Sequence, residues 1–137
     1  MKKIFLTLAL IAAFCSVAMA ETKTISKTLT AAADGTVSET LTDNFLSGYG
    51  FYLYFIRTTP SGTTAPTTLY DVEILDADGK DILGGAGLKR SATVTETAKP
   101  LIDSEKDLFP VNGNLTIRVT NAGNGGITTM KIYFVRP

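Results

Sequence analysis

The chain has 137 residues, with 13 basic and 13 acidic side chains, no histidine and no tryptophan. Without histidine there is no Ser-His-Asp or Cys-His nucleophile system, no histidine metal site and no use of the commonest general base. The balanced charge does not favour nucleic acid, whose binding domains carry a basic patch or stripe, so we expect no nucleic-acid partner.

The first twenty residues have the pattern of a cleaved export signal. Lys2 and Lys3 precede an apolar run from Ile4 to Val17, and the cleavage sequence Ala18-Met19-Ala20 follows. The alternative is an uncleaved membrane anchor, but the run is shorter than the roughly 20 residues of a comfortable bilayer span. We therefore expect a signal peptide over residues 1–20 and no stable membrane span after its cleavage.

The expected mature chain, residues 21–137, is one domain of ordinary size. Removal of two lysines leaves 11 basic against 13 acidic side chains, a net charge of −2. The only cysteine, Cys15, is removed as well, so we expect no disulfide, no thiol catalysis and no zinc–thiolate site. The domain must then depend on its core, on oligomerisation or on a bound metal, and we expect no cofactor.

Alternation of polar and apolar residues predicts strands from the start of this domain. Residues 22–30 and 36–42 both alternate, and the Asp34-Gly35 turn joins them. Residues 49–56 are apolar on both faces and are predicted to form a central buried strand. The side chains of this strand expected to point into the core are Phe51, Leu53 and Phe55.

The rest of the chain continues the pattern. Further strands are predicted at Tyr70–Ile74, Asp81–Leu83, Ser91–Ala98, Leu115–Thr120 and Ile127–Val135. The last of them is expected at a sheet edge, where another chain can pair. About seven or eight short strands without a helical period predict an all-β fold, an antiparallel β-sandwich of jelly-roll or Ig-like type in preference to a barrel.

Two groups of carboxylates are candidates for chemistry. Asp71 and Glu73 share one face of a predicted strand, as a glycosidase pair could, although the same alternation describes a solvated outer face. Asp76, Asp78 and Asp81 are the calcium candidates, but position 12 of an EF-hand loop counted from Asp76 is a glycine and not the required glutamate. We expect no catalytic residue and keep the three aspartates only as weak calcium candidates.

A glycine-rich segment, Gly84-Gly85-Ala86-Gly87, precedes Lys89 and Arg90. A phosphate-binding loop would need a following helix and a G-K-[ST] ending, and both are missing. The segment is predicted to be a flexible loop.

About half of the mature chain consists of segments that follow one another in a characteristic order: Leu69-Tyr70-Asp71-Val72, Leu75-Asp76-Ala77-Asp78-Gly79, Asp81, Leu83-Gly84-Gly85-Ala86-Gly87, Arg90-Ser91-Ala92-Thr93, Glu96, Leu115-Thr116, Val119-Thr120-Asn121-Ala122-Gly123 and Lys131-Ile132-Tyr133. In this order they resemble small β-sandwich structural proteins of tailed bacteriophages. The resemblance implies a virion accessory role, as a head decoration or tail-associated protein that binds other subunits. It implies no catalytic residue.

Three functions follow from these observations. The first is a non-catalytic structural or interaction module of virion accessory type, whose partners are protein subunits, either copies of itself in a homo-oligomer or capsid and tail proteins. The second is a secreted or periplasmic binding or adhesion β-sandwich with a cell-surface ligand, which the export signal favours. The third is an enzyme that uses Asp71 and Glu73, and it is disfavoured because no other group could carry the reaction.

Overall fold

The computed structural model describes residues 20–48, 50–102 and 105–137. The predicted export signal, residues 1–20, lies outside the described residues except for Ala20. No helix in the described ranges is long and apolar enough to cross a membrane.

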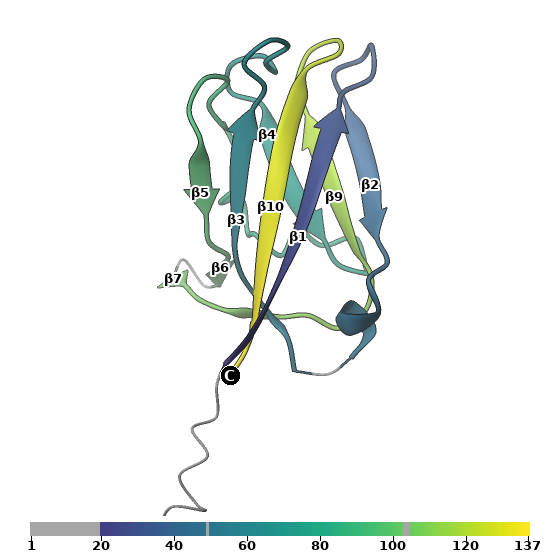
Figure 1. Ribbon diagram of the computed structural model, residues 1–137, viewed down its shortest axis with the longest axis vertical. Coiled ribbons are helices and arrows are strands. Elements are labelled where there is room, and N and C mark those ends of the chain that lie inside the picture. The colour runs from purple at the N-terminus through teal and green to yellow at the C-terminus, as the bar shows by residue number, and fades with distance from the viewer. Residues whose placement is uncertain (1–19, 49, 103–104) are drawn as a thin grey trace, which may run out of the picture.

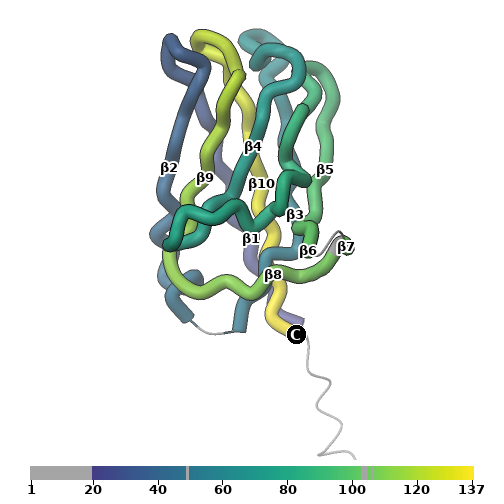
Figure 2. Tube along the Cα trace, turned by 180° about the vertical axis from the view of Figure 1, so that it is seen from behind, coloured from purple at the N-terminus to yellow at the C-terminus, as the bar shows by residue number. Residues whose placement is uncertain are grey.

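Two antiparallel sheets form the two layers of a β-sandwich (Figure 1). The first sheet contains, in spatial order, β1 (Glu21–Thr30), β10 (Ile127–Arg136), β3 (Tyr52–Pro60) and β5 (Glu96–Ala98), and β8 (Phe109–Pro110) also pairs with β3. The second sheet, nearer the viewer in Figure 2, contains β2 (Val37–Leu41), β9 (Leu115–Thr120) and β4 (Asp71–Leu75). The predicted fold class is confirmed.

Short elements complete the described chain: β6 (Leu101–Ile102), β7 (Glu105–Lys106) and the 3-10 turn η1 (Asn44–Ser47). Seven of the ten strands in the described ranges have three or more residues, which agrees with the predicted number.

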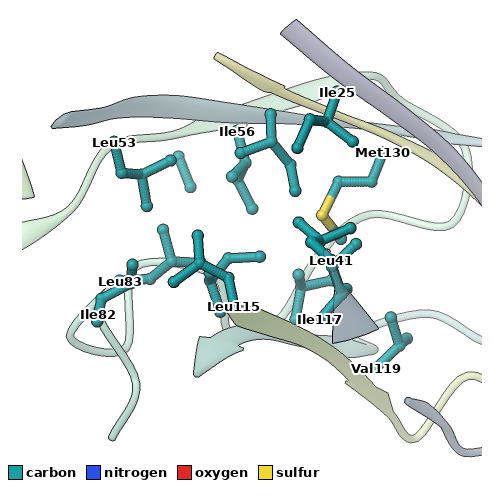
Figure 3. Packing of buried hydrophobic residues seen from close by; sticks show 14 of the residues in the cluster. Ile25, Leu41, Leu53, Ile56, Ile82, Leu83, Leu115, Ile117, Val119 and Met130 are labelled. Atoms are coloured by element: carbon teal, nitrogen blue, oxygen red, sulfur yellow. The ribbon is translucent and has the colours of Figure 1, made fainter. Parts of the chain in front are cut away.

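The core lies between the sheets because the main strands turn apolar side chains toward the opposite sheet. In β9 the apolar residues Leu115, Ile117 and Val119 are buried and the residues between them are not. Figure 3 shows the two sides of this core: from the first sheet Ile25, Ile56 and Met130, and from the second Leu41, Leu115 and Ile117. The burial of these apolar surfaces is the main stabilising contribution, at about 25 cal/mol per Å².

The prediction that the last strand forms a sheet edge is wrong. β10 is central, because β1 pairs with it over its whole length on one side and β3 pairs with it on the other. β1 therefore forms one edge of the first sheet, and β5 lies at the other end of the strand order. Lys27 of β1 points inward and forms an ion pair with Glu39 of β2 at 2.5 Å, and an inward charge of this kind discourages pairing with a further strand.

One predicted strand, Asp81–Leu83, is replaced by a turn held by a side chain, and another, Ser91–Ala98, is shortened to its last three residues. Asp81 makes a single bridge with Leu75, and its carboxylate then accepts the backbone N–H groups of Leu83 and Gly85. In the same way the Ser91 hydroxyl accepts the N–H groups of two following residues, so β5 begins only at Glu96. Short polar side chains compete with the strand ladder for backbone donors, which is why alternation overestimated these strands.

Candidate functional site

The two carboxylates considered as a catalytic pair lie on the outer face of the second sheet, each with its own partners. Glu73 accepts a hydrogen bond from Arg118 Nε at 2.6 Å, and this bond raises the pKa of Arg118. Asp71 accepts Asn121 Nδ2 at 2.8 Å and the backbone N–H of Lys89 at 2.8 Å. These contacts match the interpretation of a solvated outer face.

The three calcium candidates lie in and after the turn that follows β4. Asp76 Oδ1 accepts the N–H groups of Asp78 and Lys80, and Asp81 caps the next segment, so both carboxylates organise backbone turns. In the described part of the chain, no group of three or more acidic side chains is placed to hold a metal ion.

A bulge in β3 creates a feature that alternation did not predict. Tyr133 of β10 pairs with Phe55 and the next residue, Phe134, pairs with Leu53, so Tyr54 is an extra residue in the ladder. The extra residue reverses the alternation, as β-bulges do. Tyr54 and Phe55 therefore lie on the outer face in succession, and the prediction that Phe55 points into the core is wrong; Ile56 takes that place.

Three aromatic rings and two cations meet on this outer face. Phe55 stacks on Tyr133 with ring centroids 4.2 Å apart, and Tyr54, 41% exposed, meets Phe55 edge-on at 4.9 Å. Arg57 lies 5.9 Å from the centre of the Tyr133 ring and is paired across the strands with Lys131. We call these five residues, Tyr54, Phe55, Arg57, Lys131 and Tyr133, the aromatic–cationic patch.

The charge of this patch is not balanced locally. Like charges directly opposite each other destabilise a pair of strands, and Arg57 and Lys131 are such a pair. The outward-facing positions of β1, β10, β3 and β5 carry no acidic residue, because Glu21 and Glu96 occupy the alternate, inward register. The outer face of the first sheet is therefore positive.

Lys99 borders the patch and lines two hollows. Its ammonium group lies 4.8 Å from the centre of the Tyr54 ring, a cation–π contact. The smaller hollow, about 240 Å³, is lined by Tyr54, Lys99, Asp107 and Leu108. The larger, about 560 Å³, is lined by Ala86, Arg90, Thr97, Ala98, Lys99 and Leu101. We call the larger one the Arg90 hollow.

Close backbone packing positions Arg90. Gly87 lies so near β4 that a Cβ added to it would be 2.0 Å from the carbonyl oxygen of Val72, and its own carbonyl accepts the Val72 N–H at 3.0 Å. Arg90 N–H then donates to the carbonyl of Tyr70 at 2.6 Å. The glycines predicted to make a flexible loop thus let the chain approach β4 closely.

Left-handed backbone flanks the same contact. Lys89, just before Arg90, has φ +56°, and Leu69, just before Tyr70, has φ +67°. For residues other than glycine this conformation is unfavourable by roughly 1–2 kcal/mol. Both residues are therefore held in place by the surrounding structure, on either side of the contact that presents Arg90.

Sequence reasoning missed the patch and the hollows. One signal was available in the sequence. The charged side chain of Arg57 cannot face the core, and residues two positions apart in a strand face the same side, so Phe55 should face outward as well. That conflicts with Phe51 and Leu53 facing inward and marks a break in the alternation. No comparable signal in the sequence pointed to Lys99 or Arg90.

Comparison with known proteins gives resemblances of fold only. No protein-family model and no curated protein matches the chain. Among solved structures, it is similar to the capsid of cyanophage Pam1 (14% identity, 87% of this chain and 84% of that chain, TM-score 0.39). It is also similar to the capsid of Ralstonia phage GP4 (14%, 88% and 86%, TM-score 0.48) and to Bacillus endospore appendages (13%, 86% and 88%, TM-score 0.41). Likenesses at these TM-scores carry no argument about function.

Proposed function

We propose that this chain is a non-catalytic structural or interaction module that binds other protein subunits through the aromatic–cationic patch. The observation that carries the proposal is the bulge in β3, which turns Tyr54 and Phe55 outward beside Tyr133 and Arg57. Aromatic residues and arginine are enriched in protein interfaces, and tyrosine and arginine are frequent among the few residues that dominate binding.

The surroundings of the patch fit such an interface. Next to it, a row of threonines crosses the first sheet, with hydroxyl groups of Thr28 and Thr129 3.1 Å apart and those of Thr59 and Thr95 3.2 Å apart. Interfaces combine an apolar centre with a polar rim of this kind. The partners already made by Asp71 and Glu73 on the opposite sheet support a non-catalytic role.

The more specific form of the proposal is a virion accessory protein of decoration or tail-associated type. It is supported by the ordered segments that resemble tailed-phage structural proteins. In this form the partners are capsid or tail subunits, or further copies of the chain in a homo-oligomer.

A second candidate is an exported binding or adhesion β-sandwich. The pattern of residues 1–20 favours it, with the mature domain, residues 21–137, placed in the periplasm or outside the cell. The patch would then contact a cell-surface ligand. Mass determination of the protein recovered from its producing cells tests this candidate, since cleavage of the expected export signal leaves a chain that begins at Glu21.

The test of the proposal compares two exposed substitutions in the full chain. Tyr54→Ala removes the most exposed ring of the patch, and Thr40→Ala, on the outer face of the second sheet, is the matched control. Sedimentation velocity measures self-association, and quantitative mass spectrometry of purified particles and cell envelopes measures incorporation with other subunits. We expect Tyr54→Ala to reduce assembly at least tenfold and Thr40→Ala to preserve it. Equal assembly of both variants, or a wild-type chain that assembles with nothing, refutes the proposal.

A further inference from the structure

The Arg90 hollow contains a buried cation that is short of acceptors. The Arg90 side chain is 13% exposed, and its Nε has no hydrogen-bond partner among the described residues. The nearest carboxylate oxygen, Glu96 Oε2, is 3.8 Å away, beyond hydrogen-bond distance, and it already accepts the Ser91 N–H at 2.6 Å. Buried donors in native proteins are normally paired, and an unpaired charged donor is the most unfavourable case.

We propose that the Arg90 hollow receives a carboxylate group from the partner protein, held by Arg90 and Lys99. The inference rests on the proposed function, because it identifies what that partner brings to the surface. The planar guanidinium presents several N–H donors in a fork that matches a carboxylate, and Lys99, which also lines the hollow, adds a second positive charge. Glu96 is the carboxylate beside Arg90, and Asp107 lines the smaller hollow on which Lys99 also borders.

The hollow has the space that such a group requires. Its volume of about 560 Å³ exceeds what one carboxylate fills, so it admits an acidic side chain together with adjoining backbone. Thr97 adds a hydroxyl group to the lining, and Ala86, Ala98 and Leu101 give it apolar walls. A partner that covers the hollow excludes water from it, and the lower dielectric constant strengthens the attraction between the opposite charges.

The neighbouring patch indicates that the partner carries more than one negative charge. Arg57 and Lys131 oppose each other on the same outer face, and no carboxylate there compensates them. A partner segment with several acidic residues removes this repulsion and fills the hollow at the same time. Charge complementarity of this kind provides specificity and speeds association.

The test uses the full chain and an acetylated tetraglutamate peptide as the probe, followed by NMR. Tetraglutamine is the uncharged control, and inorganic phosphate tests whether the site takes phosphate instead of carboxylate. We expect tetraglutamate to shift the Arg90 Nε–Hε signal and the amide signals of Thr97 and Lys99, with an affinity that falls as salt is added. Tetraglutamine should shift none of them.

Variants connect the binding to named residues. Arg90→Gln and Lys99→Gln should each weaken tetraglutamate binding at least tenfold, and Arg118→Gln, a matched loss of charge on the second sheet, should leave it unchanged. Lys99 is half-buried and its ammonium group lies over the Tyr54 ring, so Lys99→Gln provides a second variant where Arg90→Gln unfolds the protein. Equal binding by wild type and Lys99→Gln, shifts confined to the patch, or binding of phosphate without tetraglutamate overturns the inference.

The inference and the proposed function fail in different ways. If Tyr54→Ala abolishes assembly while Lys99→Gln leaves both assembly and peptide binding intact, the subunit-binding function stands and the carboxylate site falls. If tetraglutamate binds in the hollow as expected but the chain assembles with no subunit, the carboxylate site stands and the proposed function falls.

Discussion

Replacement of Gly87 by alanine tests the packing that positions Arg90. The added Cβ would lie 2.0 Å from the Val72 carbonyl oxygen and 2.9 Å from Leu83 Cδ1, and the closer atom belongs to the backbone and cannot rotate away. The segment must move off β4, and this movement weakens the hydrogen bond from Val72 N–H to the Gly87 carbonyl, now 3.0 Å long.

The expected magnitude combines two effects. Overpacking a tight site typically destabilises by about 1–3 kcal/mol, and losing a backbone hydrogen bond adds about 0.5–1.5 kcal/mol. Gly87→Ala should therefore lower the free energy of unfolding by about 2–4 kcal/mol. For a folded region of this size, each kcal/mol lowers Tm by about 4 °C, so a decrease of about 8–16 °C is expected.

Thermal and urea unfolding followed by circular dichroism measure both quantities. Gly62→Ala is the matched control, because nothing lies within 4 Å of an added Cβ there and Gly62 has no positive φ. The control should change stability by no more than about 1 kcal/mol, in the stabilising direction. A Gly87→Ala variant within about 0.5 kcal/mol of wild type, the range of neutral surface changes, would show that the close approach to β4 is not required.

Three further predictions concern the core, a buried hydrogen bond and acid stability. Ile117→Ala removes a fully buried side chain and should lower the free energy of unfolding by about 2–5 kcal/mol; an unchanged urea midpoint contradicts this. Thr128→Val removes the hydroxyl 3.2 Å from the buried Tyr70 hydroxyl and should destabilise by about 1–3 kcal/mol. The Tyr70→Phe/Thr128→Val double variant should lose less than the sum of the single losses, and additive losses argue against coupling. Hydrogen bonds from the Thr36 hydroxyl and N–H lower the pKa of Asp34, so its stabilising contribution is present above the unfolded-state pKa and is lost as the pH falls through the lower folded-state pKa. Asp34→Asn should flatten the stability curve below about pH 4, and a curve parallel to wild type refutes the assignment.

Local patterns in the sequence predicted much of the fold. The alternation around Asp34-Gly35 located β1 and β2, and the alternation at Leu115–Thr120 located β9 and its buried side chains. These predictions succeed because strand periodicity and turn chemistry depend on neighbouring residues. The extent of strand at Asp81–Leu83 and Ser91–Ala98 was overestimated because side-chain hydrogen bonds to nearby N–H groups compete with strand pairing. The alternation of polar and apolar residues does not reveal this competition.

The candidate site was much less predictable from the sequence. The outward direction of Phe55 depends on a bulge that exists only because β3 pairs with β10, more than 70 positions further along the chain. The Arg90 hollow depends on β5 and on the approach of Gly87 to β4, which bring separate segments beside one guanidinium. Contacts between segments far apart in the chain arise from tertiary packing, and no local sequence pattern predicts them.

The sequence by itself determined that this is an all-β chain without histidine or tryptophan, and which faces of its main strands are apolar. Those properties follow from residue type and from a period of two. Tertiary structure alone decided that β1 and not β10 forms the edge, that Tyr54 and Phe55 face outward together, and that Arg57 opposes Lys131. The reason is that strand order, register and bulges result from pairing between residues far apart in the chain, and these pairings place the positive charges on the outer face of the first sheet.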